Sequence, residues 1–223
     1  MYGRWQRDAL LCIMPEVGGH TMYIIGLTGS IASGKSTVSR ILAECGAPIV
    51  DADMIARAVA ERGEIGWQKI VETFGEGVLQ ADGQLDRGKV GEMIFRDATK
   101  RAELDRIMHP IILERMEAEI ATYEAQGKQV VILDVPLLLE LGWQDKVSAV
   151  WLVAVSPDTQ KHRLMARNNL SEEQATIRIA SQMSIEEKRR YADVIINNDG
   201  KLEETEQIVR ARWHEVKRML NEE

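Results

Sequence analysis

The chain has few cysteines: Cys12 and Cys45 are the two among its 223 residues. One pair of cysteines cannot build the disulfide framework of a small secreted domain. Neither of them lies in a CxxC or Cys/His cluster of the kind that binds zinc. The cysteine usage therefore predicts a reducing compartment, the cytoplasm.

Long apolar runs are also missing from the sequence. The longest, Val130–Leu133, is interrupted at once by Asp134 and Pro136, whereas a membrane-spanning helix needs about 18 consecutive apolar residues. Internal repeats and low-complexity tracts are absent from the sequence as well. We expect a globular protein that is not integral to a membrane.

Basic residues are fewer than acidic ones. The 28 Lys and Arg residues against 35 Asp and Glu residues give a net charge of −7, whereas a nucleic-acid-binding protein usually carries a surplus of positive charge. The cluster Lys188–Arg190 follows Glu186 and Glu187, which is typical of a solvated helix face. We expect no nucleic-acid partner, and a monomer or a weak homo-oligomer.

Residues 1–21 differ from the rest of the sequence. Arg4 and Arg7 precede a short apolar stretch at 9–14. Because Asp8 interrupts the charged part and no small-x-small cleavage site follows, the segment is a poor signal peptide. It reflects either an upstream start codon or an unstructured tail. We predict an N-terminal extension without stable structure.

From Tyr23 onward, short apolar runs alternate with helical patterns. This alternation is typical of a parallel sheet that is covered by helices on both faces. The sequence therefore predicts an α/β, three-layer fold with a five-stranded parallel sheet. The predicted strands lie at 23–28, 48–51, 129–134, 149–154 and 193–196.

Two longer segments interrupt this alternation. The stretch from about 54 to 127 is mostly helical, with an amphipathic helix at 99–125, and an Arg-bearing stretch follows the fourth strand. We interpret the first as a substrate-side subdomain and the second as a lid that closes over phosphates. After the third strand, the run 136–140 predicts a short helix whose leucines enter the core. The predicted domain at 22–223 has a core at 22–60, 128–156 and 191–223, an insertion at about 61–127, a lid at about 157–190 and a closing helix at 201–220.

The residues from Gly29 to Ser36 fit the pattern GxxxxGK[ST]. They lie between a predicted strand and a predicted helix, which is the context of a phosphate-binding P-loop. In such a loop the backbone N–H groups bind phosphate, Lys35 reaches the β- and γ-phosphates, and the Ser36 hydroxyl can bind Mg²⁺. Glycine suits position 34 of such a loop because a Cβ there would crowd the bound phosphate. The pattern predicts binding of ATP or GTP.

The motifs of a GTPase are absent. The sequence has no Asn-Lys dipeptide for reading guanine and no Asp-x-x-Gly switch. This favours a small-molecule kinase, which needs a carboxylate near the γ-phosphate to activate the acceptor. Two alternatives stay open: another P-loop kinase, of the nucleoside monophosphate or shikimate type, and a regulatory P-loop NTPase whose hydrolysis drives a conformational change.

Three carboxylates stand at the ends of predicted strands. Strand alternation predicts that Asp51 and Asp53 both point toward the crevice above the P-loop, where one orients the acceptor hydroxyl and the other accepts its proton. As an alternative, Asp53 caps a helix at 54–61. Asp134 ends the third strand and, together with Ser36, predicts a Mg²⁺ site, although a strand-end Asp is also a common helix cap.

Several segments occur in a fixed order along the chain. They are Ile25–Ser36, Val50–Arg57, His109-Pro110, Asp134–Glu140 and Ala192–Gly200. Together they closely resemble the dephospho-CoA kinase family, over nearly the whole chain from Met22. The resemblance implies ATP-dependent phosphorylation of the ribose 3′-hydroxyl of dephospho-CoA, the last step of coenzyme A biosynthesis, with Mg²⁺ as cofactor. It also implies a helical CoA-binding insertion and a lid.

The resemblance also implies roles for single residues. Asp53 resembles the catalytic base of the family, Asp51 its partner, and Asn198 a residue that encloses the adenine. His109 falls where the family meets the acceptor, although packing of a His-Pro pair at a helix start is an alternative. The predicted residues are Lys35, Asp51 and Asp53 for catalysis; Gly29, Ala32, Ser33, Gly34, Lys35, Ser36, Thr37, Arg163, Arg167 and Asn198 for ATP; Asp53, Arg57, His109 and Pro136 for the second substrate; and Ser36 and Asp134 for the metal.

A few positions depart from the family pattern. Ser30 and Ala32 stand where relatives commonly carry glycine, which should change the flexibility of the P-loop and leave phosphate binding intact. Leu113 stands where several relatives carry a polar or basic residue, so contacts to CoA differ there.

Overall fold

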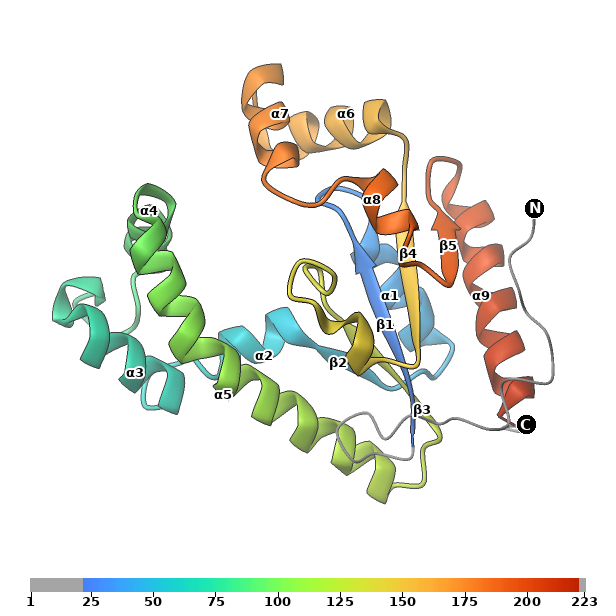
Figure 1. Ribbon diagram of the computed structural model, residues 1–223, viewed down its shortest axis with the longest axis horizontal. Coiled ribbons are helices and arrows are strands. Elements are labelled where there is room, and N and C mark those ends of the chain that lie inside the picture. The colour runs from blue at the N-terminus through green and yellow to red at the C-terminus, as the bar shows by residue number, and fades with distance from the viewer. Residues whose placement is uncertain (1–21, 221–223) are drawn as a thin grey trace. The chain divides into compact units, whose positions relative to one another are not determined.

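The computed structural model describes residues 22–220 (Figure 1). These residues form two compact units. One consists of residues 51–120, and the other combines the stretch up to Val50 with the stretch from Ala121 onward. We call them the acceptor-side unit and the nucleotide unit after the roles that the sequence predicts for them, and we describe each by itself. The predicted N-terminal extension at 1–21 lies outside the described residues.

The nucleotide unit is built on a five-stranded sheet with the order β2-β3-β1-β4-β5. Neighbouring strands run parallel, with Ile25 of β1 facing Ile132 of β3 and Ala149 of β4. Each predicted strand is confirmed to within one or two residues. The strands are β1 Tyr23–Gly29, β2 Ile49–Asp51, β3 Val130–Asp134, β4 Ala149–Ala154 and β5 Val194–Asn197.

The central strands β1, β3 and β4 are buried along their whole length. Helices α1 (Lys35–Glu44) and α9 (Leu202–Met219) pack together on one face of the sheet, and Figure 1 shows α9 alongside β5. The other face carries a smaller apolar cluster that includes Leu152 and Ile185. Cover on both faces explains why these strands read as continuous apolar runs rather than alternating ones.

The closing helix α9 confirms the predicted helix at 201–220. Val209, Trp213 and Val216 face the core, with exposed fractions of at most 9%. Ile208, which shares the helical pattern, is 36% exposed. Its neighbour Val209 fills the core position, so the apolar stripe is narrower than the sequence suggests.

Three short helices follow β4 in the segment predicted as a lid. They are α6 Pro157–Asn168, α7 Glu172–Ala180 and α8 Ile185–Arg189. Each begins after a serine whose hydroxyl accepts a hydrogen bond from a backbone N–H of the first turn; these serines are Ser156, Ser171 and Ser184. Serine is among the most favourable N-cap residues, so the helix starts are fixed locally.

The solvated face predicted at Lys188–Arg190 is wrong for its first residue. Arg189 and Arg190 are exposed, but Lys188 is completely buried. The Lys188 ammonium forms an ion pair with Glu140 at 2.9 Å and lies 3.3 Å from the carbonyl oxygen of Pro136. A buried lysine needs such a partner, and here the partner comes from a distant part of the chain.

The short helix predicted at 136–140 is also wrong. The chain from Pro136 to Gly142 forms consecutive turns, and Gly142 has a left-handed φ of +67° that ends them. A 3₁₀ helix, η2 Trp143–Lys146, follows. Leu138 and Leu139 enter the core as predicted, whereas Leu137 is 40% exposed.

The acceptor-side unit is helical. Its elements are α2 Ala52–Ala58, α3 Ile65–Phe74, η1 Glu76–Val78, α4 Arg87–Arg96 and most of α5 Ala98–Ala125. Gly66 lets α3 approach closely, because a Cβ there would lie 2.5 Å from the carbonyl oxygen of Val59 and 3.0 Å from Cε of Met108. The other buried apolar side chains of this unit include Ile55, Ile70, Val78, Leu85, Met116 and Ile120.

Helix α5 confirms the helix predicted at 99–125 and corrects the alternative for His109-Pro110. The pair does not start a helix, because Pro110 lies inside α5. Proline within a helix removes one backbone hydrogen bond. No helix among the described residues has a sufficiently long and apolar stretch to cross a membrane.

Candidate nucleotide site

The P-loop joins the end of β1 to the start of α1. Gly29 is the last residue of β1 and Lys35 the first of α1. Between them Ala32 and Gly34 adopt left-handed backbone conformations, with φ of +62° and +87°. Glycine adopts such a φ freely, whereas alanine pays a steric penalty. The backbone of the turn is therefore strained at Ala32.

The structure shows a close contact at Gly34 that the sequence did not predict, and the predicted crowding of a phosphate stays a prediction. A Cβ on Gly34 would collide first with the Nδ2 atom of Asn198. Asn198 is 7% exposed and donates a hydrogen bond from Nδ2 to the carbonyl oxygen of Ser33 at 2.8 Å. Its Oδ1 accepts a hydrogen bond from the buried hydroxyl of Thr205 at 2.9 Å. Asn198 thus lies against the P-loop backbone, while the predicted contact of Asn198 with adenine stays a prediction.

Two glutamines that the sequence analysis missed hold Ile31 of the P-loop. Gln160 of α6, 4% exposed, donates from Nε2 to the Ile31 carbonyl oxygen at 3.0 Å. Gln182, between α7 and α8, accepts the Ile31 N–H at 2.8 Å. No local sequence pattern marks these residues, since both partners are more than one hundred positions away from the loop.

Lys35 and Asp134 form an ion pair at the carboxyl ends of β1 and β3. The side chains are 15% and 3% exposed. Asp134 is therefore no solvent-exposed helix cap, because its carboxylate meets the P-loop lysine. The pair places a cation and a carboxylate next to the phosphate-binding turn, at the strand ends where ligands bind in such sheets.

Ser36 and Thr37 occupy the first turn of α1. Ser36 is exposed, so its hydroxyl is accessible to a ligand. The N–H of Thr37 donates to the Gly34 carbonyl oxygen at 3.0 Å. Among residues 22–220 no cluster of three or more His, Cys, Asp or Glu side chains could hold a metal by itself. The Ser36 hydroxyl and the Asp134 carboxylate are oxygen donors, which fit Mg²⁺ when phosphate oxygens and water complete the shell.

Of the two predicted lid arginines, Arg163 lies beside the P-loop. Its Nη2 donates to the Asn198 carbonyl oxygen at 2.9 Å, and its Nη1 would lie 3.8 Å from a Cβ on Gly34. Arg167 is exposed and donates to Asn168 next to it. The backbone N–H of Ser156 holds the pKa of Asp199 below its usual value, and the charge of Arg163 adds to this.

Asp51 and Asp53 correct two sequence predictions. Asp51 ends β2, but α2 begins directly at Ala52, so Asp53 is helical and the predicted strand alternation does not apply. Asp51, not Asp53, caps the helix, accepting the Met54 N–H at 3.0 Å. Asp53 lies in the first turn of α2 and is exposed, where a negative charge is favourable.

The other predicted substrate residues lie in different places. Arg57 is exposed in the last turn of α2. His109 is half-buried in α5, with Nε2 3.8 Å from Asp105. Pro136 follows β3, and its carbonyl oxygen accepts hydrogen bonds from Thr28 at 2.9 Å and from Lys188. Contact of these three residues with substrate stays a prediction.

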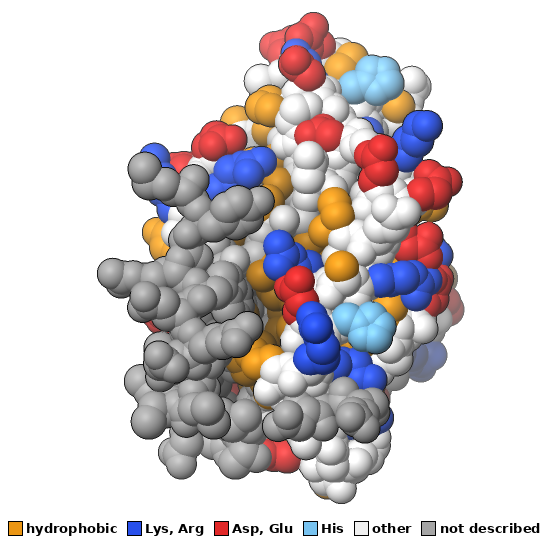
Figure 2. Space-filling view, turned by 90° about the vertical axis from the view of Figure 1, so that its right-hand side faces the viewer, with side chains coloured by type: hydrophobic (Ala, Val, Ile, Leu, Met, Phe, Trp, Pro, Cys, Tyr) orange, Lys and Arg blue, Asp and Glu red, His pale blue; other side chains and the backbone are white. Residues whose placement is uncertain are grey.

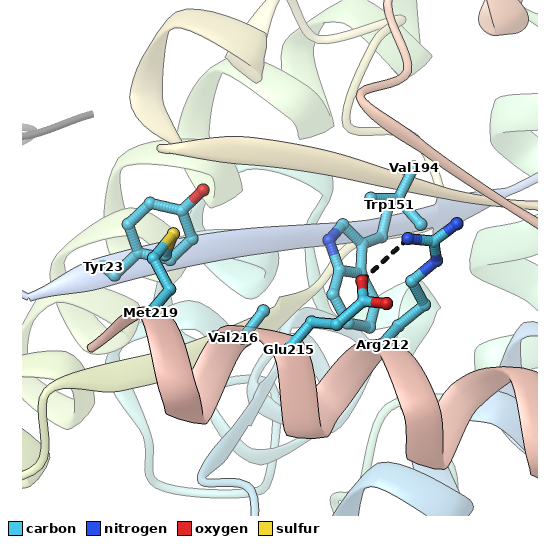
Figure 3. Close-up of a pocket in the computed structure, with 7 residues that line it drawn as sticks. All are labelled: Tyr23, Trp151, Val194, Arg212, Glu215, Val216 and Met219. Atoms are coloured by element: carbon cyan, nitrogen blue, oxygen red, sulfur yellow. Dashed lines mark hydrogen bonds and ion pairs between the residues drawn. The ribbon is translucent and has the colours of Figure 1, made fainter. Parts of the chain in front are cut away.

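A cavity of about 400 Å³ lies at the other end of the sheet (Figure 3). Its floor includes Tyr23, the first residue of β1, and α9 forms one wall with Val216 and Met219. An ion pair between Arg212 and Glu215 at 2.7 Å lies at its side. Burial and, to a smaller extent, Asp193 raise the pKa of Tyr23. The P-loop lies at the opposite end of β1, so this cavity is separate from the P-loop.

One face of the molecule, drawn in Figure 2, carries mixed charge. Lys and Arg side chains lie among Asp and Glu side chains there. Such a mixture creates no extended field of one sign. Near the P-loop, two cationic side chains, Lys35 and Arg163, are each held by a partner within the nucleotide unit.

The first strand of this parallel sheet leads through a glycine-containing turn into a helix, and the lysine of the turn forms an ion pair with an aspartate at a strand end. These features define a P-loop nucleotide-binding protein of the kinase type. The sequence profile of the dephospho-CoA kinase family matches residues 23–204. The chain belongs to the dephospho-CoA kinase family.

Curated relatives agree with this assignment. The dephospho-CoA kinase of one Bacillus cereus strain is 50% identical, over 86% of this chain and 97% of the relative. That of Symbiobacterium thermophilum is 48% identical, over 86% of this chain and 80% of the relative. The activity is therefore ATP-dependent phosphorylation of dephospho-CoA, in coenzyme A biosynthesis. The alternatives of another kinase and of a regulatory NTPase are not retained.

Solved structures show the same fold. The crystal structure of TT1252 from Thermus thermophilus matches with a TM-score of 0.76 and 34% identity, covering 88% of this chain and 98% of that one. Dephospho-CoA kinase from Campylobacter jejuni matches with a TM-score of 0.67 and 27% identity, covering 87% and 97%.

Proposed function

We propose that the P-loop with Lys35 binds the phosphates of ATP, and that Asp53 accepts the proton of the ribose 3′-hydroxyl of dephospho-CoA as the γ-phosphoryl group is transferred. The observation that carries the proposal is the ion pair of Lys35 and Asp134 beside the phosphate-binding turn. The pair supports the proposal because a held ammonium beside this turn would stabilise the charge that builds up on the transferring group.

Charge neutralisation and positioning supply most of the acceleration. Phosphoryl transfer passes through a loose transition state with negative charge on the equatorial oxygens. Lys35 is held by a nearly buried carboxylate, so its ammonium is preorganised. Arg163, tied to the Asn198 carbonyl oxygen, supplies a second cation. We propose Arg163 rather than Arg167 as the principal lid arginine, because Arg167 is bonded to its neighbour and exposed.

Magnesium fits the oxygen donors near the P-loop. Ser36 and Asp134 would hold the ion, because hydroxyl and carboxylate oxygens suit Mg²⁺. A bound Mg²⁺ ion neutralises charge on the β- and γ-phosphates. The Asp134 carboxylate also keeps Lys35 in place, so one residue serves both cations.

The two aspartates of the acceptor side have different proposed tasks. Asp51 uses its carboxylate to cap α2, which fixes the start of the helix that carries Asp53. The Asp53 carboxylate, unlike that of Asp51, has no hydrogen-bond partner within residues 22–220, and Asp53 is exposed. We therefore propose Asp53 as the base and Asp51 as a positioning residue. Arg57, His109 and Pro136 are proposed to contact dephospho-CoA.

The larger organisation is proposed from sequence and composition. The insertion at 61–127 receives CoA, and the segment at 157–190 acts as a lid. The net charge of −7 and the mixed charge on the face in Figure 2 support the proposal that no nucleic acid is a partner. A monomer or weak homo-oligomer in the cytoplasm, without a membrane partner, is proposed as well.

The base assignment is tested with Asp53→Asn. The variant should bind ATP nearly as the wild type does, while kcat falls by roughly 10²–10⁴, the usual contribution of a general base. ATP affinity is measured by calorimetry and kcat by coupled release of ADP, with dephospho-CoA as acceptor.

Two further variants complete this experiment. Glu61→Gln removes an exposed carboxylate of the same unit and should leave kcat unchanged. Asp51→Asn keeps a good cap and should lose far less activity than Asp53→Asn. Full turnover by Asp53→Asn would refute the role of Asp53, and equal losses in Asp51→Asn would assign chemistry to both carboxylates.

A further inference from the structure

Side-chain amides contact alternate carbonyl groups of the P-loop. Gln160 donates to the Ile31 carbonyl oxygen at 3.0 Å, and Asn198 donates to the Ser33 carbonyl oxygen at 2.8 Å. Both side chains are at least nine-tenths buried. They come from α6 and from the residue after β5, so two remote parts of the nucleotide unit meet the loop.

The chemistry fixes which atom of each amide faces the loop. A carbonyl oxygen can only accept a hydrogen bond, so the nitrogen of each carboxamide must face it. The Thr205 hydroxyl, 1% exposed, lies 2.9 Å from Oδ1 of Asn198 and holds the amide in this orientation. The contact is therefore directional and not merely a packing contact.

Anchoring a carbonyl group also aims the N–H of the same peptide. A trans peptide is planar, and its C=O and N–H bonds point in opposite directions. The peptide that carries the Ile31 carbonyl also carries the Ala32 N–H, and the one with the Ser33 carbonyl carries the Gly34 N–H. Within residues 22–220 neither of these N–H groups has a hydrogen-bond acceptor in the protein. Each is directed away from the amide that holds its carbonyl group.

We propose that Gln160 and Asn198 are positioning residues of the kinase, each of which aims one P-loop N–H, of Ala32 and of Gly34 respectively, at the phosphates of ATP. The inference rests on the proposed binding of those phosphates by the P-loop. For the Asn198 side chain, we thus propose orientation of the P-loop backbone in place of the contact with adenine that the family resemblance implied. It also explains the collision at Gly34, since Asn198 must approach the loop closely.

The left-handed conformation of Ala32 agrees with this role. An alanine at φ +62° is strained, and the strain persists only where surrounding contacts fix the backbone. Ile31, the residue before Ala32, is held at both of its backbone polar groups. Gln160 donates to its carbonyl oxygen, and Gln182 accepts from its N–H. The loop shape is thus imposed by side chains from the C-terminal half.

The test uses the variants Gln160→Met and Asn198→Leu, which remove the amide donor without adding charge. In the full chain, ¹⁵N–¹H resonances of Ala32 and Gly34 are followed while ADP is added. In the wild type both should shift. In Gln160→Met the Ala32 shift should be lost and the Gly34 shift kept; in Asn198→Leu the reverse should hold. Calorimetry should show ATP binding weakened about tenfold, as expected for a misdirected hydrogen bond to a charged group, with adenosine binding changed less than about twofold.

Gln182→Met is the matched comparison. It removes one hydrogen bond from the same residue, Ile31, but from the peptide that precedes the anchored one. Its loss of ATP affinity should be less than about a third of that in Gln160→Met. Thr205→Val leaves the donor of Asn198 in place and reports the stability effect of the neighbouring hydrogen bond. If one variant fails to fold, the other still tests its own peptide.

The outcomes separate two failures. If neither resonance shifts in the wild type, phosphate binding by the P-loop is itself wrong. If both shift in the wild type and both persist equally in the two variants, or if ATP and adenosine lose affinity alike, the amides merely stabilise the fold and the positioning role is wrong.

Discussion

The two units of this protein differ in how their polar groups are held. In the nucleotide unit, Lys35 meets a carboxylate that is 3% exposed, and carboxamides hold the P-loop backbone. In the acceptor-side unit, α4 has no buried residue, and Phe95 and Met54 are 78% and 60% exposed. Asp53, the proposed base, is exposed as well.

The difference follows from the chemistry on each side. Stabilising charge on a transferring phosphoryl group requires dipoles and cations that are fixed before the reaction. A proton acceptor near a neutral hydroxyl needs correct placement more than a rigid polar surrounding. The polar groups around the P-loop are accordingly buried and hydrogen-bonded, while the carboxylate of Asp53 in the other unit is exposed.

The strongest challenge to this comparison is Lys35→Ala. Removing the ammonium takes away a fixed cation and leaves Asp134 without this partner, so ATP affinity and kcat should fall together, with kcat lower by roughly 10²–10³. Calorimetry and steady-state rates measure both. Lys69→Ala, at an exposed ion pair with Glu72, is the control. Unchanged ATP affinity in Lys35→Ala would remove the P-loop assignment.

Ion pairs in the two units provide a second comparison. Lys188→Met breaks a pair whose lysine is completely buried and leaves Glu140 without its cation, so the free energy of unfolding should fall by about 3 kcal/mol. Arg87→Met breaks the exposed pair with Glu61 and should change it by less than about 1 kcal/mol. Urea unfolding monitored by circular dichroism measures both. Equal losses would contradict the contrast between the units.

The smallest effect is expected for Ala32→Gly. Glycine relieves the strain of a left-handed φ, worth about 1–2 kcal/mol, but restores backbone entropy to the unfolded chain, worth about 0.5–1 kcal/mol. The net gain in stability should lie between about 0 and about 1.5 kcal/mol. Thermal unfolding measures it, with Ala43→Gly in α1 as a control that should destabilise. A loss of stability in Ala32→Gly would show that the turn is not strained.

The fold and the P-loop were predictable because their signals are local. The strands read as apolar runs since both faces of the sheet are covered, and the predicted strand at 149–154 matches β4 at both ends. The loop from Gly29 to Ser36 carries its own pattern. The pairing of Lys35 with Asp134 could be expected from parallel strands ending at one edge.

The errors lie where the outcome depends on distant or very short elements. Strand β2 has three residues and passes directly into α2, so alternation could not extend from Asp51 to Asp53. Lys188 reads as a surface cation because its partner Glu140 is far away in sequence. Gln160 and Gln182 were missed because a glutamine in a polar helical segment carries no sign that its partner is a backbone group of the P-loop.

Gln160 and Gln182 have a consequence for how this chain can be altered. Gln160 and Gln182 both form hydrogen bonds to the backbone of Ile31. Asn169, which is exposed and has a left-handed backbone conformation, lies between them in the sequence. New chain ends or an inserted reporter at Asn169 would interrupt the backbone between Gln160 and Gln182. Both hydrogen bonds to Ile31 would remain, one on each side of the interruption. The loop that grips the nucleotide would keep its shape in a permuted enzyme.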